Sequence, residues 1–238
     1  MRGWLKATIG VVVLSGVLVG ADRIAVGVAE DEAAEQILKS GWMSPKPDVS
    51  IEGFPFLTQV VSRKLDGVLI SSDGLTVGEG KDKVDLRAFR ARLSGVEVSG
   101  NMSSATVAHG TGSALITYSD LARLLPPASE LVPNFGRLSL GAGTRLSLSY
   151  GGPGKIKASL GPFPVGDASV RSKGTTVTVD GFELNAMASL LVGVSDKSLE
   201  PISFTLSELP AGLNLSSVTP QEDGLQLAFD GKDVKLIG

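Results

Sequence analysis

Residues 51–77 read IEGFPFLTQVVSRKLDGVLISSDGLTV, and the second half of this stretch shows the pattern on which the predicted fold depends. Apolar side chains alternate with polar ones at Val68 and Ile70 and again at Leu75 and Val77. Such alternation places one row of side chains on the buried face of a β-strand. The Ser-Asp-Gly triplet between the two pairs is a typical turn sequence. The stretch therefore predicts two strands joined by a tight turn.

The same alternation recurs along most of the chain. It is found at Val84 and Leu86, Leu146 and Leu148, Ile156 with Ala158 and Leu160, Val177 and Val179, Ile202 with Phe204 and Leu206, and Leu225 with Leu227 and Phe229. Glycine-containing turn sequences occur at residues 151–154, 180–181, 223–224 and 230–231. Turns at this spacing predict a meandering antiparallel sheet.

The predicted sheet is strongly curved. The chain has 30 glycines, and glycines and bulges are the usual means by which strands bend. Near Ala88 the apolar positions change from even numbers (Val84, Leu86) to odd numbers (Phe89, Leu93), which predicts a β-bulge there. The predicted fold class is therefore α+β, mostly β, with a strongly curved antiparallel sheet.

Two helices are predicted. Residues 22–40 are rich in Ala and Glu and contain no Pro, and Asp22 is a plausible N-cap. Spacings of three and four residues give this helix one apolar face, formed by Val26, Ala29, Ala33 and Ile37. A shorter helix is predicted at 117–127, where Ser119 is a candidate N-cap and two prolines end the segment.

The N-terminus resembles an export signal. Arg2 and Lys6 precede an uncharged stretch at 7–21 that ends in small residues. Segment 1–21 is therefore predicted to be a signal peptide or, if it is not cleaved, an N-terminal anchor, followed by a single domain at 22–238. The expected location is outside the cytoplasm, in the cell envelope or periplasmic space, either free or held at the membrane by the uncleaved segment.

Composition argues against several function classes. There is no cysteine, so thiolate metal sites and disulfides lack their residues, and the single histidine, His109, leaves almost no material for a histidine metal site or a Ser-His dyad. The net charge is −3, and no long basic run offers a surface for nucleic acid. The Gly-Gly-Pro-Gly-Lys sequence at 151–155 lacks the other residues of a phosphate-binding loop. We therefore predict a protein that is not an enzyme, binds no nucleic acid and needs no cofactor.

The order of three segments resembles the LmeA family of phospholipid-binding cell-envelope proteins of actinobacteria. These segments are residues 51–77, ITYSDLARLLP at 116–126 and LPAGLNLSSVTPQEDGLQLAFDGKDVKL at 209–236. The resemblance implies a tubular lipid-binding (TULIP-like) fold, in which the curved sheet wraps around the long N-terminal helix and leaves an apolar groove. It also implies a non-enzymatic role in binding phospholipid and in supporting envelope glycolipid and mannan assembly or lipid homeostasis.

Candidate lipid contacts follow from this groove. They are the Phe-Pro-Phe-Leu residues Phe54, Phe56 and Leu57 and the helix face of Val26, Ala29, Ala33 and Ile37. The alternative for the two phenylalanines is a buried strand start, and we expect one ring to be structural and the other to face lipid. Candidate headgroup contacts are Lys83, Arg87 and Arg90. The alternative for these cations is an ordinary solvated hairpin.

Two function hypotheses remain open. The first is a lipid-binding module whose partner is phospholipid or a membrane surface. The second is an exported β-rich scaffold that docks on membrane-bound envelope enzymes and holds no lipid. An apolar groove favours the first hypothesis, whereas a fully packed interior favours the second.

Overall fold

The computed structural model describes residues 2–39, 44–77, 84–100, 104–125, 145–184, 201–205 and 211–237. In these ranges the chain forms, in order, α1 (Arg2–Lys39), β1 (Asp48–Glu52), α2 (Phe56–Ser62), β2 (Lys64–Val77), β3 (Val84–Val98), β4 (Ser104–Thr117), α3 (Tyr118–Leu124), β5 (Ser147–Gly152), β6 (Lys155–Leu160), β7 (Phe163–Lys173), β8 (Thr176–Leu184), β9 (Ile202–Thr205), β10 (Leu213–Gln221) and β11 (Gly224–Ile237). The mostly β composition and the antiparallel pairing that the sequence predicts are confirmed.

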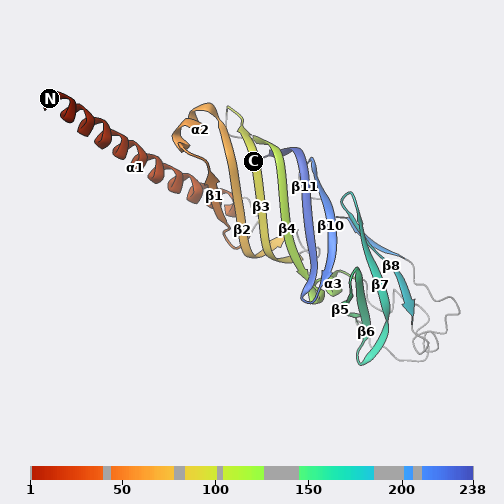
Figure 1. The fold of residues 1–238 in the computed structure, drawn as a ribbon. Coiled ribbons are helices and arrows are strands. Elements are labelled where there is room, and N and C mark those ends of the chain that lie inside the picture. Colours follow the sequence, from red (N-terminus) through yellow and green to blue (C-terminus); the bar gives the residue numbers. More distant parts are fainter. Residues whose placement is uncertain are drawn as a thin grey trace.

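The strands form two antiparallel sheets. Sheet A has the order β1-β2-β3-β4-β11-β10, and sheet B has the order β5-β6-β7-β8-β9. Figure 1 shows α1, sheet A and sheet B following one another along an elongated molecule. The predicted bulge is confirmed: Ala88 has φ 48°, and the register of β3 against β4 shifts between Arg87 and Arg90. This shift lets buried Leu86 and partly buried Phe89 both join the apolar interior.

Three predicted turns are wrong because the strands continue through them. β2 runs through the Ser-Asp-Gly triplet, where Ser72 pairs with Phe89 and Gly74 pairs with Arg87 on β3. In the same way, β8 includes residues 180–181 and β11 includes residues 230–231. Each of these segments is paired with at least one long neighbouring strand, and this ladder of hydrogen bonds outweighs a local preference for a turn. Leu206 of the predicted strands lies outside the described residues.

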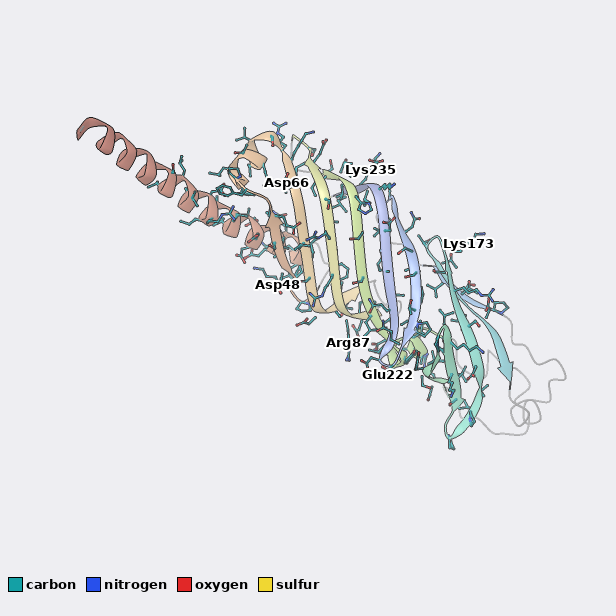
Figure 2. All side chains as sticks on the ribbon, in the orientation of Figure 1. Asp48, Asp66, Arg87, Lys173, Glu222 and Lys235 are labelled. Atoms are coloured by element: carbon teal, nitrogen blue, oxygen red, sulfur yellow. The ribbon has the colours of Figure 1, made fainter. Side chains whose placement is uncertain are left out.

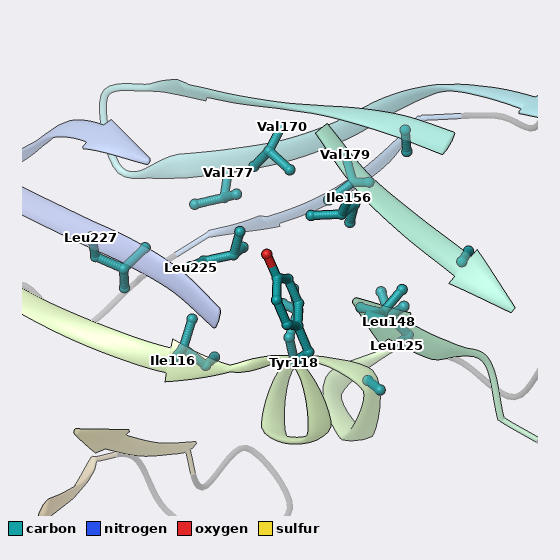
Figure 3. Close-up of a cluster of buried hydrophobic side chains, with 14 of the residues drawn as sticks. Ile116, Tyr118, Leu125, Leu148, Ile156, Val170, Val177, Val179, Leu225 and Leu227 are labelled. Carbon is teal, nitrogen blue, oxygen red and sulfur yellow. The ribbon is translucent and has the colours of Figure 1, made fainter. Parts of the chain in front are cut away.

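The main apolar core joins the two sheets. It contains Leu225 and Ile116 from sheet A, Ile156 and Val177 from sheet B, and Tyr118 from α3. Figure 3 shows Tyr118 lying among these side chains. Its hydroxyl donates a hydrogen bond of 2.7 Å to the carbonyl of Gln221, so the ring is buried without leaving its polar atom unsatisfied. The two sheets therefore share one interior.

The short helix α3 confirms the predicted second helix with a different cap. Thr117, two residues before the predicted cap Ser119, precedes the helix in an extended conformation. Its hydroxyl accepts a hydrogen bond of 3.2 Å from the amide of Asp120. This arrangement satisfies an amide that the first helical turn leaves free.

The long helix α1 lies at the edge of sheet A. It packs against β1 and α2 through its C-terminal half, and its N-terminal half extends away from the sheets (Figure 1). Among the described residues, neither buried cluster of the sheets contains a side chain from α1. The predicted wrapping of the sheet around this helix is therefore not confirmed. Within the described side chains, no helix is long and apolar enough to cross a membrane.

Candidate functional site

The Phe-Pro-Phe segment leads into a helix that begins at Phe56, so the alternative of a strand start at this segment is wrong. Pro55 is the N-cap of α2, with φ −76° and ψ 139°. Arg63 ends the helix in the left-handed conformation, and its amide donates a bond of 3.1 Å to the carbonyl of Val60. The helix separates the two rings: Phe56 is 5% exposed, whereas Phe54 is 59% exposed. The expected asymmetry of burial is therefore present, with Phe56 as the buried ring.

Asp22 of α1 caps α2. Pro55 offers no side-chain cap, and instead Oδ1 of Asp22 accepts a hydrogen bond of 2.8 Å from the amide of Leu57. The other oxygen of Asp22 lies 2.6 Å from Nη2 of Arg23, whose guanidinium lies 5.2 Å from the ring centre of Phe54. Sequence reasoning made Asp22 the N-cap of its own helix, which is wrong because α1 begins at Arg2. The carboxylate joins α1 to α2.

The environment of Asp22 lowers its pKa. Burial alone would raise the pKa of this carboxyl, but hydrogen bonds from Arg23 and from the amides of Leu57 and Phe56 favour the charged form and outweigh burial. Because the folded pKa lies below the ordinary value of 3.8, ionised Asp22 contributes its full stabilisation of the folded state above pH 3.8. This contribution is lost as the pH falls through the folded pKa.

We expect Asp22→Asn to lower the thermal unfolding midpoint at neutral pH, because the amide cannot replace the charge of the carboxylate. The gap between the parent and this variant should narrow as the pH falls from about 5 to about 2, since the parent then loses the same charge. Calorimetry across this range measures the gap. A constant gap would show that the charge on Asp22 does not hold α2.

The predicted lipid-facing stripe of α1 is used mainly for packing. Val26 is buried, Ala29, Ala33 and Ile37 are partly buried, and the neighbouring Ala34, which the sequence analysis missed, is also buried. On the same side of α1, Glu30 accepts a hydrogen bond of 2.7 Å from the amide of Ile51 on β1. This bond satisfies a donor on an edge strand. The stripe therefore attaches α1 to β1 and α2, and its contact with lipid stays a prediction.

The outer face of α2 is apolar. We define the α2 patch as Phe54, Leu57, Val60 and Val61, whose exposed fractions are 59%, 43%, 43% and 86%. Leu57, Val60 and Val61 occupy positions i, i+3 and i+4, which lie on one face of a helix. The α2 patch thus contains two of the predicted lipid contacts, Phe54 and Leu57.

A second apolar surface lies on sheet A at the α2 end. Its centre is formed by Val96, Val107 and Val234, which are buried. Partly buried apolar side chains pack around them, and we call the following set the rim: Leu65, Val68, Leu93, Val98 and Leu236. This small cluster is distinct from the main core that joins the two sheets. Sequence alternation placed Val68 on a strand but did not bring the rim together, because its members come from three strands, β2, β3 and β11, that are separated in the chain.

The cluster on sheet A has a partly exposed apolar rim, and sites for small molecules are lined mainly by apolar side chains. The family model for LmeA-like phospholipid-binding proteins matches residues 20–230. The chain belongs to this family. The LmeA-like family is a lipid-binding family and not an enzyme family. Comparison with curated proteins and with solved structures finds no significant match.

Of the predicted headgroup cations, those that the structure describes do not lie beside the α2 patch of this LmeA-like chain. Arg87 and Arg90 are exposed and flank the bulge of β3, whereas Lys83 lies outside the described residues. Figure 2 shows Arg87 at the end of sheet A opposite to Asp66, which lies just after α2. The structure therefore does not bring these cations together with the α2 patch.

A hollow of about 310 Å³ lies beside α3 and is lined in part by Tyr118, Arg123 and Arg145. Nη1 of Arg145 donates hydrogen bonds to the carbonyls of Arg123 (2.7 Å) and Leu125 (3.0 Å). Arg123 forms an ion pair with Asp120. Because both guanidinium groups already have protein partners, a phosphate would have to displace these contacts. This hollow is the weaker candidate for a headgroup in an LmeA-like protein.

The described residues offer no group of three side chains that could hold a metal ion. His109 is exposed, and its Nε2 lies 3.7 Å from Oδ2 of Asp230 on the neighbouring strand β11. Such a pair is typical of a solvated sheet surface. We therefore place the candidate site of this LmeA-like protein on its apolar surfaces.

Proposed function

We propose that this protein is a non-enzymatic phospholipid-binding protein of the cell envelope, and that lipid acyl chains lie against the rim on sheet A. The observation that carries the proposal is the separate apolar cluster at the α2 end, whose centre is buried while its rim stays partly exposed. Covering the rim with an acyl chain would remove more apolar surface from water, at about 25 cal/mol for each Å².

The pairing of β2 with β3 supports this position for the acyl chain. Val68 lies directly opposite Leu93, so the two side chains share one face of sheet A. The next residue, Leu69, lies opposite Arg92 and belongs to the other face. The pair on the rim face is thus wholly apolar, whereas the neighbouring pair on the other face includes the exposed Arg92.

The proposal extends to location and biological role. The charge pattern at 1–21 supports export, with a mature chain that begins near Asp22 or stays anchored. The LmeA resemblance supports a part in envelope glycolipid and mannan assembly or in lipid homeostasis. The TULIP-like arrangement, with the sheet closing around a helix, belongs to the same proposal and would bring the stripe of α1 to the lipid. Membrane-bound envelope enzymes are the partners that this role would require.

The test is to purify the protein from the envelope of cells that make it and to identify the lipid extracted from it by mass spectrometry. We expect phospholipid in the parent, and a loss of about tenfold in the variant that carries Val68→Gln and Leu93→Gln, because two polar groups replace the apolar rim. Leu69→Gln is the matched control on the other face and should keep its lipid. The intact mass of the same preparation identifies the first residue.

Equal lipid content in all three proteins would place the ligand elsewhere. A parent that carries no lipid would contradict the proposed function and favour the scaffold that docks on envelope enzymes. If cells that lack the protein make normal mannan and normal membrane glycolipids, the proposed biological role is wrong while lipid binding stands.

A further inference from the structure

The exposed apolar side chains of this protein are concentrated near one end. In the described part of the chain, every exposed large apolar side chain except Tyr150 lies on α1 or in the segment 54–61. Scattered single apolar residues are normal on a protein surface, but a contiguous group indicates a contact surface. The α2 patch is such a group.

The polarity of α2 is inverted. Its buried side chains are Phe56 and the polar Gln59, whereas three aliphatic side chains face outward. Gln59 is held inside by two hydrogen bonds: its Nε2 donates to the carbonyl of Glu52 (3.2 Å), and its Oε1 accepts from the amide of Asp66 (2.8 Å). A polar residue with satisfied partners therefore occupies the inner face, and the apolar residues remain available for another surface.

The position of the α2 patch indicates what that surface is. α2 contacts α1 close to the point where α1 leaves the sheets, and the helix continues toward its N-terminus with exposed Val17, Leu18 and Val19 (Figure 1). The uncharged stretch at 7–21 extends in the same direction. The α2 patch and the apolar half of α1 therefore lie at the same end of the molecule.

Cations border the α2 patch. The guanidinium of Arg23 lies over the ring of Phe54 and also pairs with Asp22, and exposed Arg63, the second cation, directly follows the last residue of α2. Aliphatic and aromatic side chains flanked by arginines suit the interface of a bilayer, where the apolar groups enter the acyl boundary and the cations meet anionic headgroups. A protein partner with a matching apolar groove would not require these cations.

We propose that the α2 patch docks on the surface of a phospholipid bilayer and inserts Phe54, Leu57 and Val61 at the headgroup boundary. The inference deepens the proposed function, because docking at this end brings the rim of sheet A, which begins at Leu65 just after α2, close to the membrane from which lipid would be taken. It is tested separately from lipid loading.

The absence of cysteine allows a direct test. Val61→Cys and Tyr150→Cys each introduce a single thiol, which is labelled with an environment-sensitive fluorophore in protein recovered from its own envelope. Vesicles of phosphatidylcholine and phosphatidylglycerol are then added. We expect the emission at position 61 to rise about threefold or more and to be quenched by brominated lipid, with little change at position 150. No change at position 61, or equal changes at both positions, would overturn the proposal.

A second measurement uses the affinity for the same vesicles. The variant that carries Phe54→Ser, Leu57→Ser and Val61→Ser should bind about tenfold more weakly or worse in flotation, and its unfolding midpoint should stay close to that of the parent because these side chains are exposed. If the unfolding midpoint of this triple variant falls, the single variant Val61→Ser is used in its place. Reversing Arg87 and Arg90 to Glu, at the opposite end of sheet A, should leave binding unchanged. Unchanged binding in the patch variant, or a loss confined to the Arg variant, would contradict docking through α2.

The same variants separate docking from lipid loading. We expect the patch variant to retain co-purified phospholipid, because the rim is intact. If it loses its lipid but still binds vesicles, the α2 patch contacts the bound ligand and not a bilayer, and the inference is wrong. It is also wrong if light scattering finds a parental dimer that the patch substitutions dissociate, since the α2 patch would then hold a second copy of the chain.

Discussion

Gly224→Ala should lower the free energy of unfolding by more than about 3 kcal/mol. Gly224 opens β11 after the turn from β10, with φ 155°, a conformation that side-chain-bearing residues rarely adopt. A Cβ at this position would lie 2.1 Å from the carbonyl oxygen of Ile116 and 2.9 Å from its carbonyl carbon. These atoms belong to the backbone of β4, which is held between β3 and β11, so neither strand can move without breaking the ladder.

Two glycines provide matched controls for this variant. Gly154 also has a positive φ of 71°, but nothing lies within 4 Å of an added Cβ, so Gly154→Ala should cost only the strain of the left-handed conformation, about 1 kcal/mol. At Gly74 nothing lies within 4 Å of an added Cβ and the backbone is not in the left-handed region, so Gly74→Ala should change the free energy of unfolding very little. Denaturant midpoints measure all three. If Gly224→Ala is no worse than Gly154→Ala, β11 does not approach β4 as closely as the structure shows.

Ile156→Ala should lower the free energy of unfolding by about 2 to 5 kcal/mol, because it leaves a cavity in a core with little freedom to relax. Ile156 is fully buried on β6 of sheet B and belongs to the cluster that also contains Leu225 and Ile116 of sheet A. The loss should therefore reach both sheets. Hydrogen exchange measured by mass spectrometry should show faster opening in peptides from β4 as well as from β6.

Ile156→Val is the conservative control, and it should cost about 0.5 to 1.5 kcal/mol with the same distribution between the sheets. Faster exchange confined to sheet B would show that the sheets unfold independently. The chain from residue 22 onward would then consist of two domains, contrary to the prediction of one.

Several features were predictable because they depend on residues close together in the chain. Alternation of period two identified most strands, and the change of phase near Ala88 identified the bulge that lets Leu86 and Phe89 face the same interior. The apolar stripe that contains Val26 indicated a helix and the face by which it packs. Motif order pointed to the lipid-binding family whose model matches residues 20–230.

Other features could not be predicted because their partners lie far away in the chain. The hydrogen bond that caps α2 joins Asp22 to Leu57, which are 35 residues apart, and no local signal shows that this carboxylate replaces a cap that Pro55 cannot supply. The rim is another example, since Leu65 lies on β2 and Leu236 lies on β11, far apart in the chain.

By itself, then, the sequence determined the antiparallel β character, the bulge and the packing face of α1, because hydrophobic period acts over a few residues. The order of its motifs also indicated, by resemblance, the lipid-binding family. Tertiary structure decided that β2 continues through Ser72-Asp73-Gly74, since the pairing partners on β3 satisfy its backbone. It also decided that Phe56 turns inward while Phe54 stays in solvent, because residues 56–62 form a helix whose first turn is capped by a carboxylate from α1.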